Sequence, residues 1–85
     1  MKIIYSSEFK RAFKKLSNEA KLTAIKKEKI FKINPFDIRL KTHKLTGKLR
    51  DCWAFSISYS DRIIFEFGND DIIFFHSVGS HDIYK

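Results

Sequence analysis

The residues best suited to chemistry stand at the end of the chain. An apolar run ends at Gly79, and Ser80, His81, Asp82 and Tyr84 follow almost at once. A histidine can accept or donate a proton near neutral pH because its ordinary pKa lies there. A tyrosine beside it can stack on a base or hold a phosphate. From spacing alone, a polar turn with a solvated Asp82 explains the same residues equally well.

Two other segments supply groups that would face this histidine. Arg62 follows Asp61 at the start of an Ile- and Phe-rich run, where its guanidinium can reach a phosphate. The alternative is an ion pair with Asp61 or Glu66. His43, in a basic segment, is a phosphate ligand, a second proton carrier or only a polar loop residue. Such groups suit metal-free RNA cleavage, which needs a base, an acid and cations around the phosphate.

Metal and cofactor chemistry have little support in the sequence. The chain has one cysteine, and its three histidines show no close ligand pairing. We therefore expect no metal and no cofactor. Cys52 is expected to be an inert, packed thiol. His76 lies in an apolar run among aromatic residues, where a histidine is expected to be structural and part of the core.

The positive charge lies almost wholly in the first part of the chain. Residues 1–50 carry a net charge of +11 and residues 51–85 carry −4, which together give the +7 of the whole chain. A basic half of this kind indicates a polyanionic partner, and nucleic acid is the commonest one. The alternative is that these lysines only keep two small helices soluble.

The remaining composition favours a cytoplasmic protein with no membrane partner. A single cysteine excludes an internal disulfide. No apolar stretch approaches the roughly 20 residues needed to span a bilayer. The first residues also lack the pattern of a signal peptide.

The elements that must position these residues follow from the hydrophobic spacing. Residues 3–5 predict a strand, and Ser6 or Ser7 can cap a helix that runs to about Leu16. Ser17 can cap a second helix, which ends before Pro35. The predicted face of this second helix consists of Leu22, Ile25, Lys29 and Ile33, and Phe31 widens its apolar coverage.

Residues 36–49 indicate a loop or irregular strand. From Cys52 onward, apolar residues alternate with a period of two. Residues 52–57, 62–67 and 72–78 predict three strands joined by short turns, an antiparallel meander. We therefore predict an α+β fold with one domain over residues 1–85. In this two-layer βααβββ sandwich, an N-terminal helical hairpin packs on an antiparallel sheet.

Four short segments follow the basic hairpin in order: residues 43–47 (HKLTG), 53–57 (WAFSI), 61–65 (DRIIF) and 79–84 (GSHDIY). In order and spacing the set resembles the RelE/ParE superfamily, the toxins of type II toxin–antitoxin modules. The RelE/StbE and YafQ-like branches are the most similar, and the resemblance covers nearly the whole chain. It implies a RelE-like, microbial ribonuclease-type fold.

The resemblance also implies an activity and residue roles. Toxins of these branches enter the ribosomal A site and cut mRNA without a metal, and an antitoxin binds them. By position, His81 matches the C-terminal catalytic histidine of YafQ-like toxins, and Arg62 matches the phosphate-stabilising arginine of RelE- and YoeB-like toxins. Asp61 matches a YafQ-like catalytic aspartate, His43 the histidine of a His-x-Leu motif, and Tyr84 a terminal aromatic residue.

The resemblance therefore implies a bacterial or archaeal protein with three partners: the ribosome, mRNA and a cognate antitoxin. The basic residues expected to hold ribosomal RNA are Lys14, Lys15, Lys41, Lys44, Lys48 and Arg50.

Departures from the family keep two alternatives open. Tyr59 stands near the place of the YoeB-like glutamate base, and the second central histidine of YafQ-like toxins has no counterpart. The chain therefore has fewer proton carriers than its relatives. One alternative is a ParE-like inhibitor that binds DNA gyrase and cuts nothing. The other is a degenerate toxin that only binds an antitoxin or nucleic acid.

Overall fold

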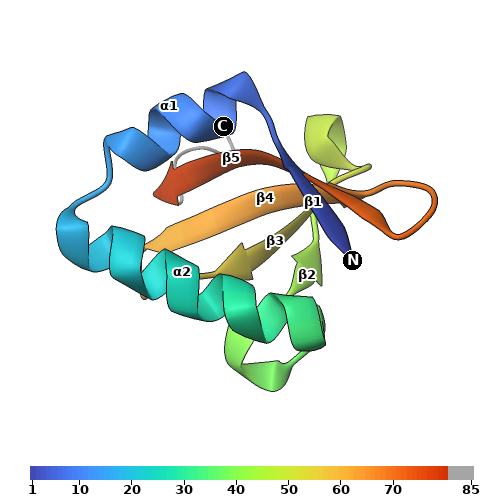
Figure 1. Ribbon diagram of the computed structural model, residues 1–85. Coiled ribbons are helices and arrows are strands. Elements are labelled where there is room, and N and C mark those ends of the chain that lie inside the picture. The colour runs from blue at the N-terminus through green and yellow to red at the C-terminus, as the bar shows by residue number, and fades with distance from the viewer. Residues whose placement is uncertain (81–85) are drawn as a thin grey trace.

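The computed structural model describes residues 1–80 of the 85-residue chain. Two helices lie against one face of a five-stranded sheet, so the protein has two layers (Figure 1). In chain order the elements are β1 (Lys2–Tyr5), α1 (Ser7–Lys14), α2 (Asn18–Ile33), the 3-10 turn η1 (Ile38–Leu40), β2 (His43–Lys44), the 3-10 turn η2 (Gly47–Leu49), β3 (Trp53–Ser56), β4 (Asp61–Phe67) and β5 (Ile72–Ser80). No helix in this described part is long and apolar enough to cross a membrane.

The sheet has the strand order β1-β5-β4-β3-β2. Strands β2 to β5 pair antiparallel, as the short turns predict. The pairing of β1 is different, because β1 runs parallel to β5 at the edge of the sheet. The predicted α+β sandwich is confirmed, with this parallel pair and the short strand β2 as additions.

Serine caps begin both helices, as the sequence predicts. The Ser6 hydroxyl accepts a hydrogen bond from the Phe9 amide at 2.9 Å and donates one to the His76 carbonyl at 2.8 Å. The Ser17 hydroxyl accepts one from the Ala20 amide at 3.1 Å. Each cap satisfies an amide that has no partner within the first helical turn.

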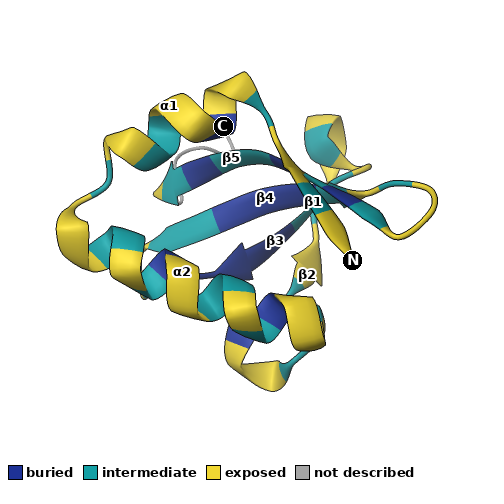
Figure 2. Cartoon of the chain, viewed as in Figure 1, coloured by how far each residue is buried: buried dark blue, intermediate teal, exposed yellow. Residues whose placement is uncertain are grey.

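The predicted apolar face of α2 is wrong in part, because Phe31 is buried but Leu22 and Ile33 are exposed. Leu22 and Ile33 are 62% and 88% exposed, whereas Ala24 and Phe31 are 3% and 0% exposed. Ala24 and Phe31 are two turns apart and therefore lie on one side of the helix, which faces the sheet. Figure 2 shows the alternation of buried and exposed turns along α2.

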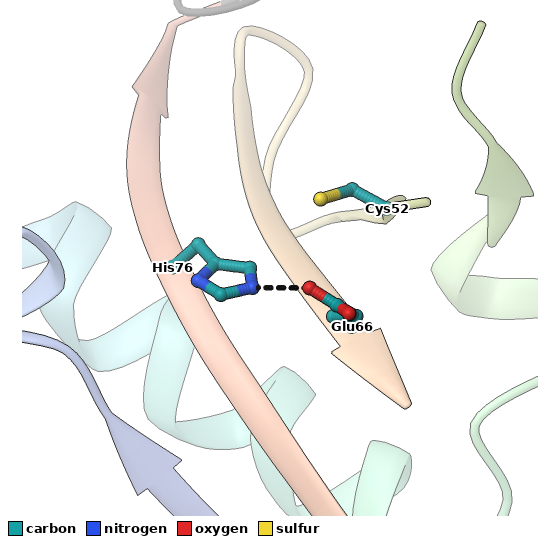
Figure 3. Close-up of side chains that lie close together, drawn as sticks. All are labelled: Cys52, Glu66 and His76. Carbon is teal, nitrogen blue, oxygen red and sulfur yellow. Dashed lines mark hydrogen bonds and ion pairs between the residues drawn. The ribbon is translucent and has the colours of Figure 1, made fainter. Parts of the chain in front are cut away.

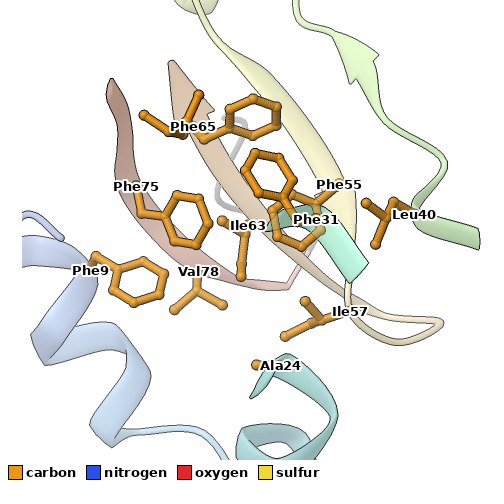
Figure 4. Close-up of a cluster of buried hydrophobic side chains, with 11 residues drawn as sticks. Phe9, Ala24, Phe31, Leu40, Phe55, Ile57, Ile63, Phe65, Phe75 and Val78 are labelled. Atoms are coloured by element: carbon orange, nitrogen blue, oxygen red, sulfur yellow. The ribbon is translucent and has the colours of Figure 1, made fainter. Parts of the chain in front are cut away.

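Aromatic rings fill the space between the helices and the sheet. The ring of Phe31 stacks on Phe55, with their centroids 4.8 Å apart. It meets Phe65 and Phe75 edge to face at 4.9 and 5.5 Å. Figure 4 shows these rings with Ile63 in one cluster. Such contacts add to the hydrophobic gain from burial, so this cluster holds α2 on β3, β4 and β5.

A β-bulge interrupts β5 at His76. Ile64 pairs with Ser77 but Phe65 pairs with Phe75, so His76 is the extra residue of β5. The expectation that His76 belongs to the core is wrong, because its side chain is 39% exposed and contacts Glu66. A bulge redirects side chains, and this one places His76 outside the core.

Candidate nucleic-acid interface

A basic cleft opens at the end of the sheet where β3 turns into β4. Its volume is about 760 Å³. Its cationic side chains come from α2, from η1 and the residue after it, and from β4. Its other residues come from the end of β3, the β3–β4 turn and the end of β5. The lining residues are Lys27, Arg39, Lys41, Ser56, Ile57, Ser58, Tyr59, Ser60, Arg62 and Ser80. No carboxylate belongs to this lining within residues 1–80, so the cleft suits an anion.

Arg62 is held in the cleft by the turn beneath it. Its Nη1 group donates to the carbonyl oxygens of Ser58, Tyr59 and Asp61 at 3.0, 3.2 and 3.1 Å. Among residues 1–80 it forms no ion pair with Asp61 or Glu66, the alternative raised by the sequence. The guanidinium also carries Nε and Nη2 donors, which make no hydrogen bond within the described residues. These donors can reach a phosphate in the cleft.

Asp61 is part of the same turn. Its amide donates to the Ser58 hydroxyl at 3.0 Å, and that hydroxyl donates to the Asp61 carboxylate at 3.2 Å. Asp61 pairs across the strands with Ser80, and Arg62 pairs with Gly79. The fold therefore brings Asp61 and Arg62 to the last two described residues of the chain.

The tail itself lies beyond what the structure describes. His81 and Tyr84, predicted as catalytic residues, fall outside residues 1–80, as does Asp82. The residue before His81, Ser80, lines the basic cleft. The described part of the chain therefore ends at the cleft.

A second arginine, Arg39, reaches the cleft from η1. The Arg39 guanidinium donates from Nε and Nη2 to the two carboxylate oxygens of Asp37, each at 2.9 Å. These hydrogen bonds lower the pKa of Asp37 to about 2, so Asp37 stays ionised at neutral pH. The carbonyl of Arg39 accepts a hydrogen bond from Lys27 at 3.3 Å. The pair fixes Arg39 at the rim of the cleft and offsets part of its charge.

His43 lies on the same sheet face as Arg62 but does not line the cleft. It pairs with Ala54 of β3, whereas Arg62 pairs with Ser56 two residues along the same strand. Paired residues and alternate residues of a strand share a face. Two strand spacings and two residues separate the backbones of His43 and Arg62 by roughly 12 Å. The ring nitrogen Nδ1 of His43 contacts the Lys41 carbonyl at 3.1 Å.

The predicted RNA-binding residues divide into two groups. Lys41 lines the cleft, and Lys44, Lys48 and Arg50 are exposed on β2 and around η2. Lys14 and Lys15 are exposed at the end of α1, far along the chain from β2 and outside the cleft lining. The structure thus brings one of the six into the cleft.

Sequence reasoning missed Lys27, Arg39 and the serines as lining residues. Ser56, Ser58 and Ser60 alternate through the β3–β4 turn, beside Arg62. Hydroxyls at this spacing next to an arginine are a signal that the sequence contains. Lys27 carries no such signal, because α2 has lysines on several sides.

Known structures share this fold. No protein-family model matches the chain, and no curated protein sequence matches it significantly. YafQ from E. coli strain BL21(DE3) superposes with a TM-score of 0.77 at 20% identity, over 95% of this chain and 93% of YafQ. E. coli YafQ is also solved with DinJ as a toxin–antitoxin complex.

Two further neighbours extend the likeness. A YoeB/ParE toxin from Agrobacterium tumefaciens gives a TM-score of 0.79 at 15% identity, over 95% of this chain and 99% of the toxin. A chain of the archaeal RelE–RelB complex from Pyrococcus horikoshii OT3 gives a TM-score of 0.75 at 14% identity, over 93% of this chain and 92% of that chain. At these identities the likenesses establish the fold, and the expected RelE-type fold is confirmed.

Proposed function

We propose that this chain is the toxin of a type II toxin–antitoxin system and a member of the RelE/ParE superfamily. In this proposal it is a ribosome-dependent mRNA endoribonuclease that inhibits translation without a catalytic metal. The observation that carries the proposal is the basic cleft, in which Arg62 and Ser80 lie together among lysine, arginine and serine side chains. A phosphodiester is the anion that such a lining suits.

The reaction is an attack by the RNA on its own backbone. The 2′-oxygen bonds to the adjacent phosphorus and the bond to the 5′-oxygen breaks, which leaves a cyclic phosphate and a 5′-hydroxyl. Arg62 stabilises the charge on the phosphate through its Nε and Nη2 donors. His81 transfers a proton to or from the reacting oxygens.

The other predicted residues assist this reaction. Asp61 holds the turn that carries Arg62, and His43 faces the same side of the sheet. Tyr84 positions the substrate. The exposed lysines hold ribosomal RNA, and the sequence-independent charge attraction makes this binding depend on salt.

An antitoxin is the proposed regulator. DinJ bound to YafQ shows a protein of the same fold in a toxin–antitoxin complex. The excess of +11 in residues 1–50 suits an acidic partner.

Mapping of cellular mRNA tests the proposal. Primer extension after expression of the wild-type chain should show cuts within codons of translated messages. Arg62→Ala should reduce them strongly, and an untranslated copy of the same message should stay intact. Equal cutting of translated and untranslated RNA would contradict ribosome dependence.

A ParE-like action is the second candidate, since the Agrobacterium neighbour carries both names, YoeB and ParE. In that case the same cells show intact mRNA and arrested DNA supercoiling. If neither effect occurs and growth is normal, the chain is a degenerate binding module.

A further inference from the structure

We propose that Cys52, Glu66 and His76 form a zinc-binding site on the sheet face that α1 and α2 do not cover. The site is separate from the basic cleft, since no residue belongs to both. Glu66 stands four residues beyond Arg62 on β4, roughly 13 Å along the strand. The inference does not depend on the proposed ribonuclease activity.

Three potential ligand atoms converge at this place. The Cys52 sulfur, one Glu66 carboxylate oxygen and one His76 ring nitrogen all lie within 4.8 Å of one another. Nε2 of His76 and Oε1 of Glu66 are 3.0 Å apart. Figure 3 shows the three side chains pointing toward a common space from separate stretches of the chain.

Strand register brings these residues together, which explains why sequence spacing missed the cluster. Trp53 pairs with Phe65, so continuation of this register places Cys52 opposite Glu66. On the other side of β4, the bulge makes His76 the extra residue of β5. In a regular strand, Phe75 and Val78 would point to opposite faces of the sheet. The extra residue of the bulge lets both be buried, with His76 and Ser77 between them.

The donor set matches zinc better than the other common ions. A thiolate and an imidazole select a borderline or soft ion, whereas magnesium and calcium prefer oxygen ligands throughout. Three protein ligands leave a fourth tetrahedral position for water or an incoming group. Glu8 of α1 lines the same depression and adds negative charge at its edge.

The surroundings also favour a cation. The carboxylates of Glu66 and Asp51 both act on the Cys52 thiol and place negative charge around it. The same negative charges attract a metal ion. All three side chains are half-exposed, so an ion has a path from solvent.

Only small movements would complete the coordination. With bond lengths of about 2.0–2.3 Å, the ligand atoms of a tetrahedral zinc site lie roughly 3.3–3.6 Å apart. Ligand atoms within 4.8 Å of one another reach that spacing if side-chain rotations move them by about 1 Å. Zinc would replace the hydrogen bond between His76 and Glu66. The competing explanation is that this hydrogen bond is a cross-strand contact without a metal.

Zinc titration of the full chain, competed against a chromophoric chelator, tests the site. We expect one equivalent of tightly bound zinc, and Cys52→Ser and His76→Gln should each weaken binding by tenfold or more. The matched controls are His43→Gln and His81→Gln, which remove the other two histidines and should leave the affinity unchanged. Cobalt in place of zinc should give a thiolate-to-metal charge-transfer band that Cys52→Ser abolishes.

Thermal unfolding gives a second readout, and circular dichroism first establishes that each variant folds. Zinc at a hundredfold excess over its dissociation constant should raise the melting temperature of the wild-type chain by about 15 °C. The rise should be absent in Cys52→Ser. The proposal is overturned if the wild-type chain binds no zinc, if Cys52→Ser and His76→Gln bind it as tightly, or if only the His43 or His81 variant loses it.

Discussion

Arg62 has two roles at the level of the single residue. Its Nη1 group donates to three carbonyls at the β3–β4 turn. In the proposed function its remaining donors bind the phosphate. The sequence predicts its position, because the residue directly follows Asp61 at the start of a β-rich run. It does not predict the contacts with the turn, since these depend on where the folded carbonyls point.

Arg62→Lys should therefore impair the protein although it keeps the charge. A lysine ammonium cannot bind the turn and a phosphate at the same time, because it is a single compact donor group. We expect the unfolding free energy to fall by about 1 kcal/mol and mRNA cleavage to fall by about tenfold or more. Urea denaturation and ribosome-programmed cleavage measure the two effects. Arg11→Lys, an exposed substitution on α1, is the matched control and should change neither.

Tyr5 predicts a pH dependence. Its hydroxyl donates to the Glu28 carboxylate across β1 and α2. Burial and then this hydrogen bond raise its pKa to about 12. In the unfolded chain the phenol ionises near pH 10. The protonated phenol therefore stabilises the fold fully below about pH 10, and this contribution is lost as the pH rises toward 12.

Comparison of the wild-type chain with Tyr5→Phe isolates the contribution of the Tyr5 hydroxyl to stability. The wild-type chain should be more stable at pH 8 by about 1 kcal/mol, because the site is partly screened by solvent. The difference should shrink between pH 10 and 12, as measured by urea denaturation. A difference that stays constant across this range would contradict the assignment.

At the level of the element, α2 shows where sequence reasoning stops. Its caps and its end before Pro35 are local features, and both are confirmed. Its buried face depends on the partner it packs against. Apolar residues lie on several sides of this helix, so spacing predicts the exposed Leu22 and Ile33 together with the buried Phe31. The face that is buried is decided by the aromatic rings of the sheet, which pack against Phe31.

Matched truncations on α2 test this face. Phe31→Ala should lower the unfolding free energy by about 3–5 kcal/mol, because it leaves a cavity among Phe55, Phe65 and Phe75. Leu22→Ala should change it by less than about 0.5 kcal/mol, because the side chain is exposed. Denaturant unfolding measures both. Equal losses would mean that Leu22 is also packed.

At the level of the whole molecule, charge and topology act together. The +11 of residues 1–50 is visible in the sequence, but its distribution over the surface is not. Folding brings Lys27, Arg39 and Lys41 to the start of β4, into the cleft that Arg62 also lines. Lys14 and Lys15 lie at the end of α1, outside this cleft. The sequence predicts a polyanion partner, whereas the place of contact follows from the topology.

Charge reversal at two lysines distinguishes the cleft from the helix surface. Lys41→Glu should weaken binding to ribosomes by about tenfold or more, and Lys14→Glu should weaken it much less. Co-sedimentation with ribosomes at two salt concentrations measures both. If Lys14→Glu has the larger effect, the basic cleft is not the main RNA contact.

Single-turnover cleavage on purified, programmed ribosomes tests the central claim most directly. The substrates are two mRNAs that differ only in the A-site codon, which has ribose in one and 2′-deoxyribose in the other. We predict that the wild-type chain cuts the ribose message within that codon, leaving a cyclic phosphate, and spares the deoxy message. His81→Ala should slow the cut by about 10²–10⁴-fold. An intact ribose message, cleavage of the deoxy message or an unchanged rate with His81→Ala would contradict the account.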